Sequence, residues 1–186
     1  MIANAHIYGL DESVRAAKFP MTVDTASCTT AVTPRTEALG TAPRGSGHDQ
    51  FLTGIIVQFD LTLSIKAWTE AERYHFFDFV SSQSTMHRIL TLDPAVQCNE
   101  YVEPEAIDLL ERLIARHQAD PSADNYLRVL YNVPTGFRLT ARMTTNYRQL
   151  KTIYAQRHNH RLPEWREFCK WLETLPHSNW ITCEED

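Results

Sequence analysis

The chain has 186 residues and a mass of 21.4 kDa, which predicts one domain with a full-sized core. Apolar residues make up 43% of it and charged residues 22%, which excludes a disordered or fibrous protein. The formal net charge of −5 argues against general nucleic-acid binding and against binding to an anionic membrane, although a local basic pocket remains compatible with it. No stretch is long and apolar enough to span a membrane, and the first residues do not resemble a secretory signal.

The four cysteines are widely spaced and form no CxxC pair; they are Cys28, Cys98, Cys169 and Cys183. In a chain of this length they are typical of reduced thiols, so we expect a cytoplasmic protein without a disulfide framework. Cys169 lies on the apolar stripe of a predicted helix and is expected to pack in the core. Together with His158 and His160 it could be imagined as a metal site. Solvent-exposed histidines are the better interpretation of a His-x-His pair, and no metal is expected.

Three elements are predicted in the N-terminal third. Residues 11–18 are expected to form a short helix with Asp11 as its N-cap, and Pro20 is expected to end it. Residues 22–47 are rich in Thr, Ser, Ala, Pro and Gly without apolar periodicity, which indicates a long mobile loop, either a functional lid or a disordered segment. Residues 51–64 alternate apolar and polar side chains, which predicts a strand with one buried face.

Helices and a second strand are predicted after residue 64. The apolar spacing predicts a helix at 67–80, with Phe76, Phe79 and Val80 inward. Capping residues and apolar spacing predict four more helices: one that begins at Pro104, one from the N-cap Ser122 to about 130, one from Thr144 or Thr145 to about 157, and one that begins at Pro163. Residues 136–143 alternate again, with Arg138 and Arg142 on the outer face. The tail, 177–186, is expected to be peripheral. We therefore expect an α+β fold: a single domain with a sheet packed by about five helices.

One side of the helix ending near residue 157 combines apolar and polar chemistry. Asn146, Leu150, Ile153 and Arg157 follow steps of four, three and four residues, which places them on one stripe. A guanidinium that emerges from an apolar stripe can bind an anion through two hydrogen bonds. The alternative is that Arg157 extends to solvent near the helix C-terminus, where the helix dipole favours a cation.

General catalytic motifs such as GxGxxG, the Walker loop, HExxH and GxSxG are absent. The stretch from Pro134 to Arg157, however, resembles the C-terminal signature of the flavin-dependent thymidylate synthases. That signature has a proline, a Thr-rich strand, Asn-x-Arg-x-Leu (here Asn146, Arg148 and Leu150) and an arginine one helix length later. An earlier block is also similar to this family: His48 precedes the long strand, and Glu70 to His75 follows it where the family has Gln-x-x-Arg-His-Arg.

The chain departs from the family at several arginine positions. Of the Arg-His-Arg triplet only Arg73 is an arginine, and His75 replaces the second one. The family's Asn-Glu pair falls on Val80 and Ser81, and the arginine after the serine falls on Thr85 or Met86. The phosphate-binding arginine falls on Leu130, with Arg128 nearby but on another helix face. Each lost charged contact weakens phosphate recognition by about 1.5–3 kcal/mol.

The resemblance implies a divergent flavin-dependent thymidylate synthase-like methyltransferase of nucleotide biosynthesis. Its substrate would be a pyrimidine nucleotide such as dUMP, with FAD as cofactor and NADPH and methylene-tetrahydrofolate as further reactants. Arg157 and Ser84 would be catalytic, and His48, Arg73, His75, Asn146 and Arg148 would bind the cofactor or nucleotide. The family is usually homotetrameric, with active sites built from several chains.

Two alternatives remain open from the sequence. The chain could keep the fold without methylation activity, as a nucleotide-binding, flavin-binding or assembly subunit. It could instead be an interaction protein in which the match of spacings is coincidental, because Asn-x-Arg-x-Leu alone is a weak signal. The basic face formed by Arg138 and Arg142 is compatible with either an enzyme or a binding protein.

Overall fold

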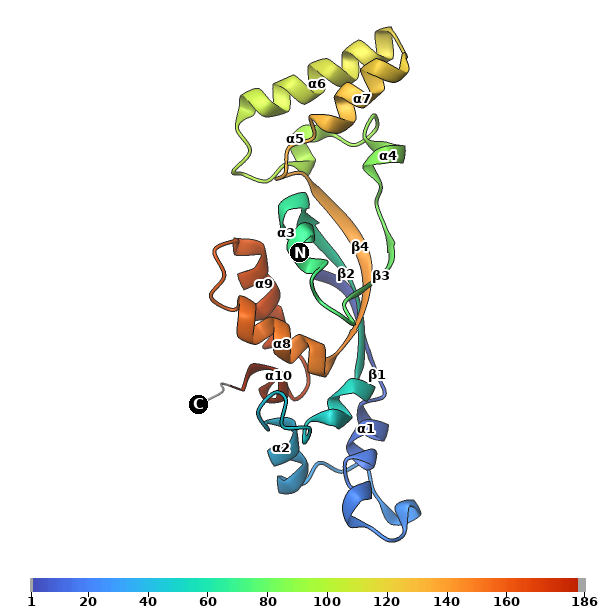
Figure 1. Cartoon of the computed structure of the whole chain (residues 1–186), viewed down its shortest axis with the longest axis vertical. Coiled ribbons are helices and arrows are strands. Elements are labelled where there is room, and N and C mark those ends of the chain that lie inside the picture. The colour runs from blue at the N-terminus through green and yellow to red at the C-terminus, as the bar shows by residue number, and fades with distance from the viewer. Residues whose placement is uncertain (1, 184–186) are drawn as a thin grey trace.

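The computed structural model describes residues 2–183 and has an α+β fold, as predicted (Figure 1). Four antiparallel strands form one sheet in the order β1-β2-β4-β3. The strands are β1 (Ile2–Tyr8), β2 (Ile56–Ser64), β3 (Asp78–Ser82) and β4 (Arg138–Asn146). The helices are α1 (Leu10–Ala16), α2 (Pro34–Gly40), α3 (Ile65–Ala71), α4 (Thr85–Arg88), α5 (Pro94–Gln97), α6 (Pro104–Ala119), α7 (Ala123–Tyr131), α8 (Tyr147–Arg157), α9 (Pro163–Leu172) and α10 (Asn179–Thr182).

The two predicted strands are confirmed and pair with each other along their whole length. The register of β2 and β4 runs without a break from Ile56 opposite Asn146 to Ser64 opposite Arg138. The apolar side chains of β2 alternate into the core, where Val57, Phe59, Leu61 and Leu63 are at most 1% exposed. Residues 50–54, most of which were expected to begin the strand, form a 3-10 turn instead.

The helices cover one face and both ends of the sheet. Figure 1 shows α3, α8 and α9 on one face, α6 and α7 beyond one end, and α1 and α2 at the other end. No helix of residues 2–183 covers the opposite face in this view. The α6–α7 hairpin has a small core of its own, formed by Ile89, Cys98, Leu110, Ile114, Val129 and Phe137. The chain is therefore elongated, with the main core in its middle.

The prediction of one helix over 67–80 is wrong. Helix α3 ends at Ala71, and residues 78–82 form β3, which pairs with β4 along the sheet edge. Phe76 adopts a left-handed φ of 59° at the turn, and Phe76, Phe79 and Val80 are exposed rather than inward. Strand pairing with β4 thus overrides the apolar spacing from which the helix was predicted.

The first strand was not predicted, because its burial does not alternate: five of the seven β1 residues are exposed, and Ile2 and Ile7 are half-buried. It is held instead by pairing with the edge of β2, from Ile2 opposite Leu61 to Tyr8 opposite Ile56. The helix expected at 11–18 begins one residue earlier, and its N-cap is Gly9 at a left-handed φ of 72° rather than Asp11.

The segment 22–47 contains more structure than a long loop. Thr33 caps α2 by accepting a hydrogen bond from the Thr36 backbone, and Pro34 occupies the favoured first position of that helix. Gly40 ends α2 against Trp180, and a Cβ at Gly40 would lie only 2.5 Å from the indole. The mobility of the rest of this segment stays a prediction.

The tail is not peripheral over its described part. Trp180 and Ile181 of α10 are 0% and 1% exposed, and Trp180 Nε1 donates to Glu37 Oε2 at 2.6 Å. This contact fastens α10 to α2, two segments that no local sequence pattern connects. Residues 184–186 lie outside the described residues.

The predicted helices of the C-terminal half are confirmed. Ser122 caps α7, and α6 and α9 begin at Pro104 and Pro163 as expected. Cys169 is 1% exposed, and burial raises the pKa of its thiol to about 12, in keeping with core packing. All four cysteines are free thiols, and none of the described helices is long and apolar enough to cross a membrane.

Replacing Trp180 by Ala is expected to lower the free energy of unfolding by about 3 kcal/mol, because it leaves a cavity against Gly40 and removes a buried hydrogen bond to Glu37. Urea denaturation followed by circular dichroism measures the loss. Tyr131→Ala, at a position that is 84% exposed, is the matched control and should change the value by less than about 0.5 kcal/mol. Equal effects of the two variants would contradict the role of α10.

Candidate functional site

The predicted stripe on α8 faces the core. Asn146, Leu150, Ile153 and Arg157 are each at most 9% exposed. Asn146, rather than Thr144 or Thr145, caps the helix, because its Oδ1 accepts from the Gln149 backbone at 2.9 Å. The two polar ends of the stripe lie about 16 Å apart at 1.5 Å per residue. A single helix therefore presents an amide at one place and a guanidinium at another.

A cavity of about 180 Å³ lies at the N-terminal end of α8. Arg148 extends along it, with Nε donating to Asp49 Oδ1 at 3.2 Å and Nη1 donating to Gln50 Oε1 at 2.9 Å. Asp49 is fully buried, and its Oδ2 makes no hydrogen bond to a described residue. The cavity is lined by Arg44, Gly45, Asp49, Thr53, Phe76, Asn146, Arg148, Gln149 and Thr152.

Lys151 fastens the wall of this cavity to α8. Its ammonium group donates to the carbonyl oxygens of Gly40, at 3.0 Å, and Ala42, and lies 3.8 Å from Asp49 Oδ2. Lys151 is only 1% exposed, so these contacts replace its hydration. One buried cation thus holds both ends of the loop that carries Arg44 and His48.

His48 lies beside the cavity rather than in it. Its side chain is exposed and lines a neighbouring hollow of about 470 Å³ together with Arg35, Gln50 and Phe51. Gln50 also accepts the hydrogen bond from Arg148, so it lies between the two hollows. The structure therefore places His48 in a hollow next to the cavity that Asn146 and Arg148 line, and a shared site for the three residues stays a prediction.

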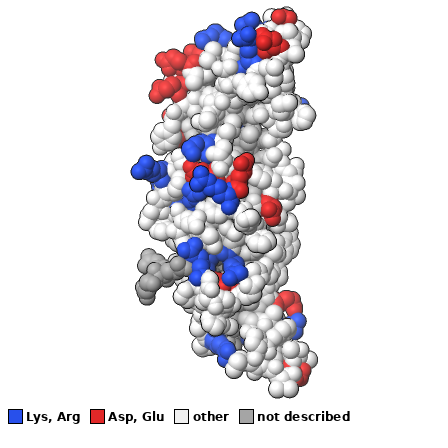
Figure 2. All heavy atoms as spheres, in the orientation of Figure 1, with Lys and Arg blue, Asp and Glu red and all other residues white. Residues whose placement is uncertain are grey.

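Arg157, at the other end of α8, is held by buried partners. Its Nε donates to the Tyr74 hydroxyl at 2.7 Å, and its Nη1 donates to Glu70 Oε2 at 2.8 Å. The guanidinium carbon also lies 5.0 Å from the centre of the Trp165 ring. Arg157 does not extend freely to solvent, which excludes the simpler of the two predictions for it. Figure 2 shows charged side chains of both signs gathered midway along the molecule, at the level of α3 and α9 in Figure 1.

The charges around Arg157 change the acid–base properties of their neighbours. Burial acts to raise the pKa of Glu70, but the Lys66 hydrogen bond and the nearby cations outweigh it, so the pKa is lowered and the carboxylate stays ionised. Burial and the charge of Arg157 lower the pKa of His160. His160 Nδ1 accepts from the Leu162 backbone at 3.2 Å, and His160 Nε2 lies 2.7 Å from Arg157 Nη1 and 3.2 Å from Glu70 Oε2.

Arg73, His75 and Ser84 lie outside these two places. Arg73 and His75 are exposed in the turn between α3 and β3, on either side of Tyr74. Ser84 precedes α4 beyond the far end of β3. Because β3 runs antiparallel to β4 with Ser82 opposite Ala141, Ser84 and Asn146 are separated by roughly 20 Å along the sheet. One chain does not bring Ser84 to the cavity.

The two outer arginines of β4 are occupied within the chain. Arg142 Nη1 donates to the Asn4 carbonyl at 2.7 Å and to Asp60 Oδ1 at 3.2 Å. Arg138 donates to the backbone carbonyls of Gln97 and Cys98. They are therefore not the open basic face that alternation suggested.

The imagined metal ligands do not converge. His158 is exposed and stacks on Tyr154, His160 faces Glu70, and Cys169 is in the core. No group of three or more His, Cys, Asp or Glu side chains within residues 2–183 could hold a metal ion.

Sequence reasoning assigned no role to four polar residues that organise the site: Asp49, Lys151, Glu70 and Tyr74. One local signal existed, because Lys66 and Glu70 have the i, i+4 spacing of a helical ion pair, which they form at 2.8 Å. The others act through contacts about 80 to 110 residues apart in the chain, such as Lys151 with Gly40 and Arg157 with Tyr74. No local pattern reports such contacts.

Comparison with protein-family models and with curated protein sequences finds no match. Comparison with solved structures does. A flavin-dependent thymidylate synthase ThyX from Helicobacter pylori, solved with FAD and dUMP, aligns with a TM-score of 0.75 and 18% identity over 98% of this chain and 96% of that one. A second structure of that enzyme gives 0.70 and 17% over 98% and 97%.

The UMP/dUMP methylase PolB from Streptomyces cacaoi, bound to 5-Br dUMP, aligns with a TM-score of 0.64 and 14% identity, covering 92% of this chain and 89% of that one. At these identities the likeness concerns the fold. It extends over nearly the whole chain, well beyond the two blocks that carried the sequence resemblance. This chain therefore has the fold of the flavin-dependent thymidylate synthases.

Lys151→Met is expected to lower the free energy of unfolding by about 3 kcal/mol, because it removes the cation beside Asp49 Oδ2 and leaves the Gly40 and Ala42 carbonyls without their donor. Urea denaturation measures this. Lys170→Met removes an exposed lysine on α9 and should change the value by less than about 0.5 kcal/mol. A loss for Lys151→Met no larger than this would show that the lysine does not fasten the loop.

The lowered pKa of His160 predicts a pH-dependent stability. Below the ordinary histidine pKa of about 6.5 the unfolded chain takes up a proton that the folded chain refuses, so the free energy of unfolding falls as the pH falls. His160→Gln should therefore show a smaller loss than the wild type between pH 7.5 and 5.5 in urea denaturation. His87→Gln, at an exposed position, should follow the wild-type curve; identical pH dependence in all three proteins would contradict the assignment.

Proposed function

We propose that this chain is a divergent flavin-dependent thymidylate synthase-like protein that binds FAD and a pyrimidine nucleotide such as dUMP. One observation carries the proposal: Asn146 and Arg148, the two polar residues of the resembling motif, line one cavity at the start of α8. They do so in a fold shared with proteins solved with FAD and dUMP.

The residues of this cavity fit part of a flavin dinucleotide. Arg148, 34% exposed at its side chain, offers a cation for a phosphate, and Gln149 and Asn146 offer amides for a ring edge. The exposed Phe76 offers an aromatic face for stacking. The unbonded Oδ2 of Asp49 can accept a hydrogen bond from an amino group. A cavity of about 180 Å³ holds one ring of the cofactor rather than all of it.

The nucleotide would be bound by Arg157 and Ser84 of different chains. Within one chain Ser84 lies at the far end of β3, far from α8. We therefore propose a homotetramer in which each site combines residues from several copies, with Arg73 and His75 of the exposed turn facing the flavin or the nucleotide.

In the proposed reaction a one-carbon unit passes from methylene-tetrahydrofolate to carbon 5 of the nucleotide base, and carbon 5 loses its hydrogen as a proton. When bound, FAD supplies hydride that originates from NADPH. Arg157 would stabilise negative charge that develops on the pyrimidine ring. Asn146, Arg148 and His48 would orient the cofactor. The protein would thereby serve nucleotide biosynthesis, and its four free thiols support a cytoplasmic location.

A second candidate function is binding without methylation. Two observations favour it: Arg157 is already paired with Glu70, and family arginine positions are occupied by Leu130 and by Thr85 or Met86. A protein with these replacements would hold the flavin or the nucleotide as a binding or assembly subunit. FAD retention reports binding, and tritium release from the nucleotide reports catalysis.

FAD should be retained by the purified protein. After incubation with FAD and gel filtration, a flavin absorption band is expected to co-elute with the wild type, and Arg148→Met should retain at least about tenfold less, because a charged contact is worth about 1.5–3 kcal/mol. Arg161→Met, at an exposed position, is the control and should retain FAD like the wild type. A wild type that elutes colourless contradicts flavin binding.

Release of tritium from 5-tritiated dUMP in the presence of FAD, NADPH and methylene-tetrahydrofolate distinguishes the two candidate functions. Release above the level of an Arg157→Ala variant supports the methyltransferase. FAD retention without release supports the binding protein.

A further inference from the structure

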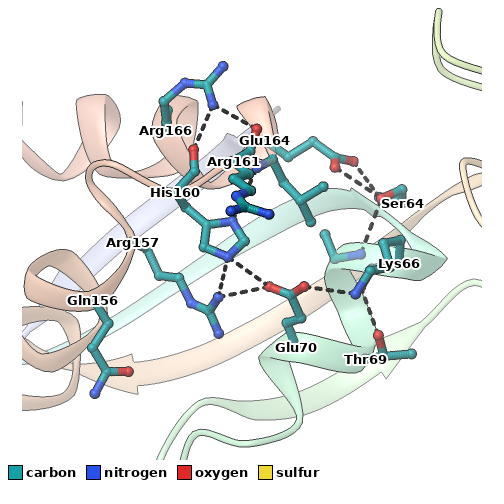
Figure 3. Close-up of polar contacts among 12 residues, drawn as sticks. Ser64, Lys66, Thr69, Glu70, Gln156, Arg157, His160, Arg161, Glu164 and Arg166 are labelled. Atoms are coloured by element: carbon teal, nitrogen blue, oxygen red, sulfur yellow. Dashed lines mark hydrogen bonds and ion pairs between the residues drawn. The ribbon is translucent and has the colours of Figure 1, made fainter.

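Glu70 and Arg157 form a nearly closed ion pair between α3 and α8 (Figure 3). Glu70 Oε2 accepts from Arg157 Nη1 at 2.8 Å, and Glu70 Oε1 accepts from Lys66 Nζ at 2.8 Å. The Glu70 and Arg157 side chains are only 13% and 11% exposed. Because little water screens them, this pair is stronger than a typical surface ion pair.

The pair uses most of the hydrogen-bonding capacity of Arg157. Nε donates to the Tyr74 hydroxyl, and Nη1 donates to Glu70 and lies 2.7 Å from His160 Nε2. Among the described residues only Nη2 has no hydrogen-bond partner. A guanidinium binds a planar acceptor through two adjacent nitrogens, and either choice that includes Nη2 also includes a nitrogen already in use. A ligand therefore cannot bind Arg157 in this way without displacing a side chain.

Further contacts hold Glu70 in its place. His160 Nε2 lies 3.2 Å from Glu70 Oε2 and 2.7 Å from Arg157 Nη1. The turn that carries His160 is fixed in turn by Arg166, whose Nη1 donates to the carbonyls of His160 and Arg161 at 2.6 and 2.8 Å. Figure 3 shows Glu70 enclosed by Lys66, Arg157 and His160. The carboxylate thus has three partners, and Arg157 has one negative charge already beside it.

We propose that Glu70 sets the ligand affinity of Arg157: a pyrimidine nucleotide that binds the Nη1–Nη2 edge of Arg157 through two hydrogen bonds has to displace the Glu70 carboxylate from Nη1. A neutral carbonyl forms a weaker hydrogen bond with a guanidinium than a carboxylate does. The apparent Kd for the nucleotide is therefore the intrinsic Kd divided by the fraction of molecules in which Arg157 is open. This inference rests on the proposed function. The resembling motif carries a neutral glutamine at the position of Glu70.

The closed pair is tested first without any nucleotide. Phenylglyoxal modifies accessible guanidinium groups, and mass spectrometry of peptides gives the rate at each arginine. Relative to the exposed Arg73, Arg157 is expected to react about tenfold faster in Glu70→Gln than in the wild type. Glu72→Gln, an exposed position on the same segment, is the matched control. Glu70→Asp keeps the charge but shortens the side chain. If Glu70→Gln does not fold, Glu70→Asp replaces it and should also make Arg157 react faster with phenylglyoxal than in the wild type.

The nucleotide is tested next by calorimetric titration of dUMP in the presence of FAD. Glu70→Gln should bind dUMP about tenfold more tightly than the wild type, and Glu72→Gln should bind like the wild type. Unchanged Arg157 reactivity in Glu70→Gln and Glu70→Asp would overturn the inference, and so would a faster reaction with unchanged or weaker dUMP affinity. Faster reaction with no dUMP binding in any protein would instead support the closed pair and contradict the proposed nucleotide ligand.

Discussion

Three cations of helix α8 make the hydrogen bonds and ion pairs that join distant segments of this structure. Lys151, buried in the middle of the helix, holds the Gly40 and Ala42 carbonyls and faces Asp49. One turn before it, Arg148 binds Asp49 and Gln50, and at the helix end Arg157 binds Glu70 and Tyr74. Because these partners precede α8 by about 80 to 110 residues, a single helix fixes three separate segments against the sheet.

Within one chain, the candidate site residues lie in three separate places. The residues at the start of α8 border a cavity, whereas Arg157 at its end is enclosed by its own partners. The third group, around Ser84, is carried to the far end of the sheet by β3. An uninterrupted nine-residue pairing of β2 with β4 keeps these places apart. The proposed site, which includes Ser84, would therefore combine residues of different copies, as in the tetramer proposed above.

Much of the fold could be predicted, because the alternation of β2 and β4 and the stripe of α8 are local patterns that report burial directly. The spacing also placed Asn146, Leu150, Ile153 and Arg157 on one helix face, and all four are buried. What could not be predicted depends on distant partners. β1 and β3 form because they pair with β2 and β4, and their own side chains do not alternate between buried and exposed. Trp180 can be buried because Gly40 has no side chain that would clash with the indole ring. The engagement of Arg157 by Glu70 likewise follows from the placement of α3 beside α8.

A crystal structure of the protein with FAD and dUMP would show whether this fold binds both ligands at sites shared between copies. We expect FAD in contact with Asn146 and Arg148 of one copy, and dUMP between Arg157 and Ser84 of different copies, with Glu70 displaced from Arg157. Ligands bound elsewhere would contradict it, as would a monomer with the Glu70–Arg157 pair intact and no ligand bound at saturating concentrations.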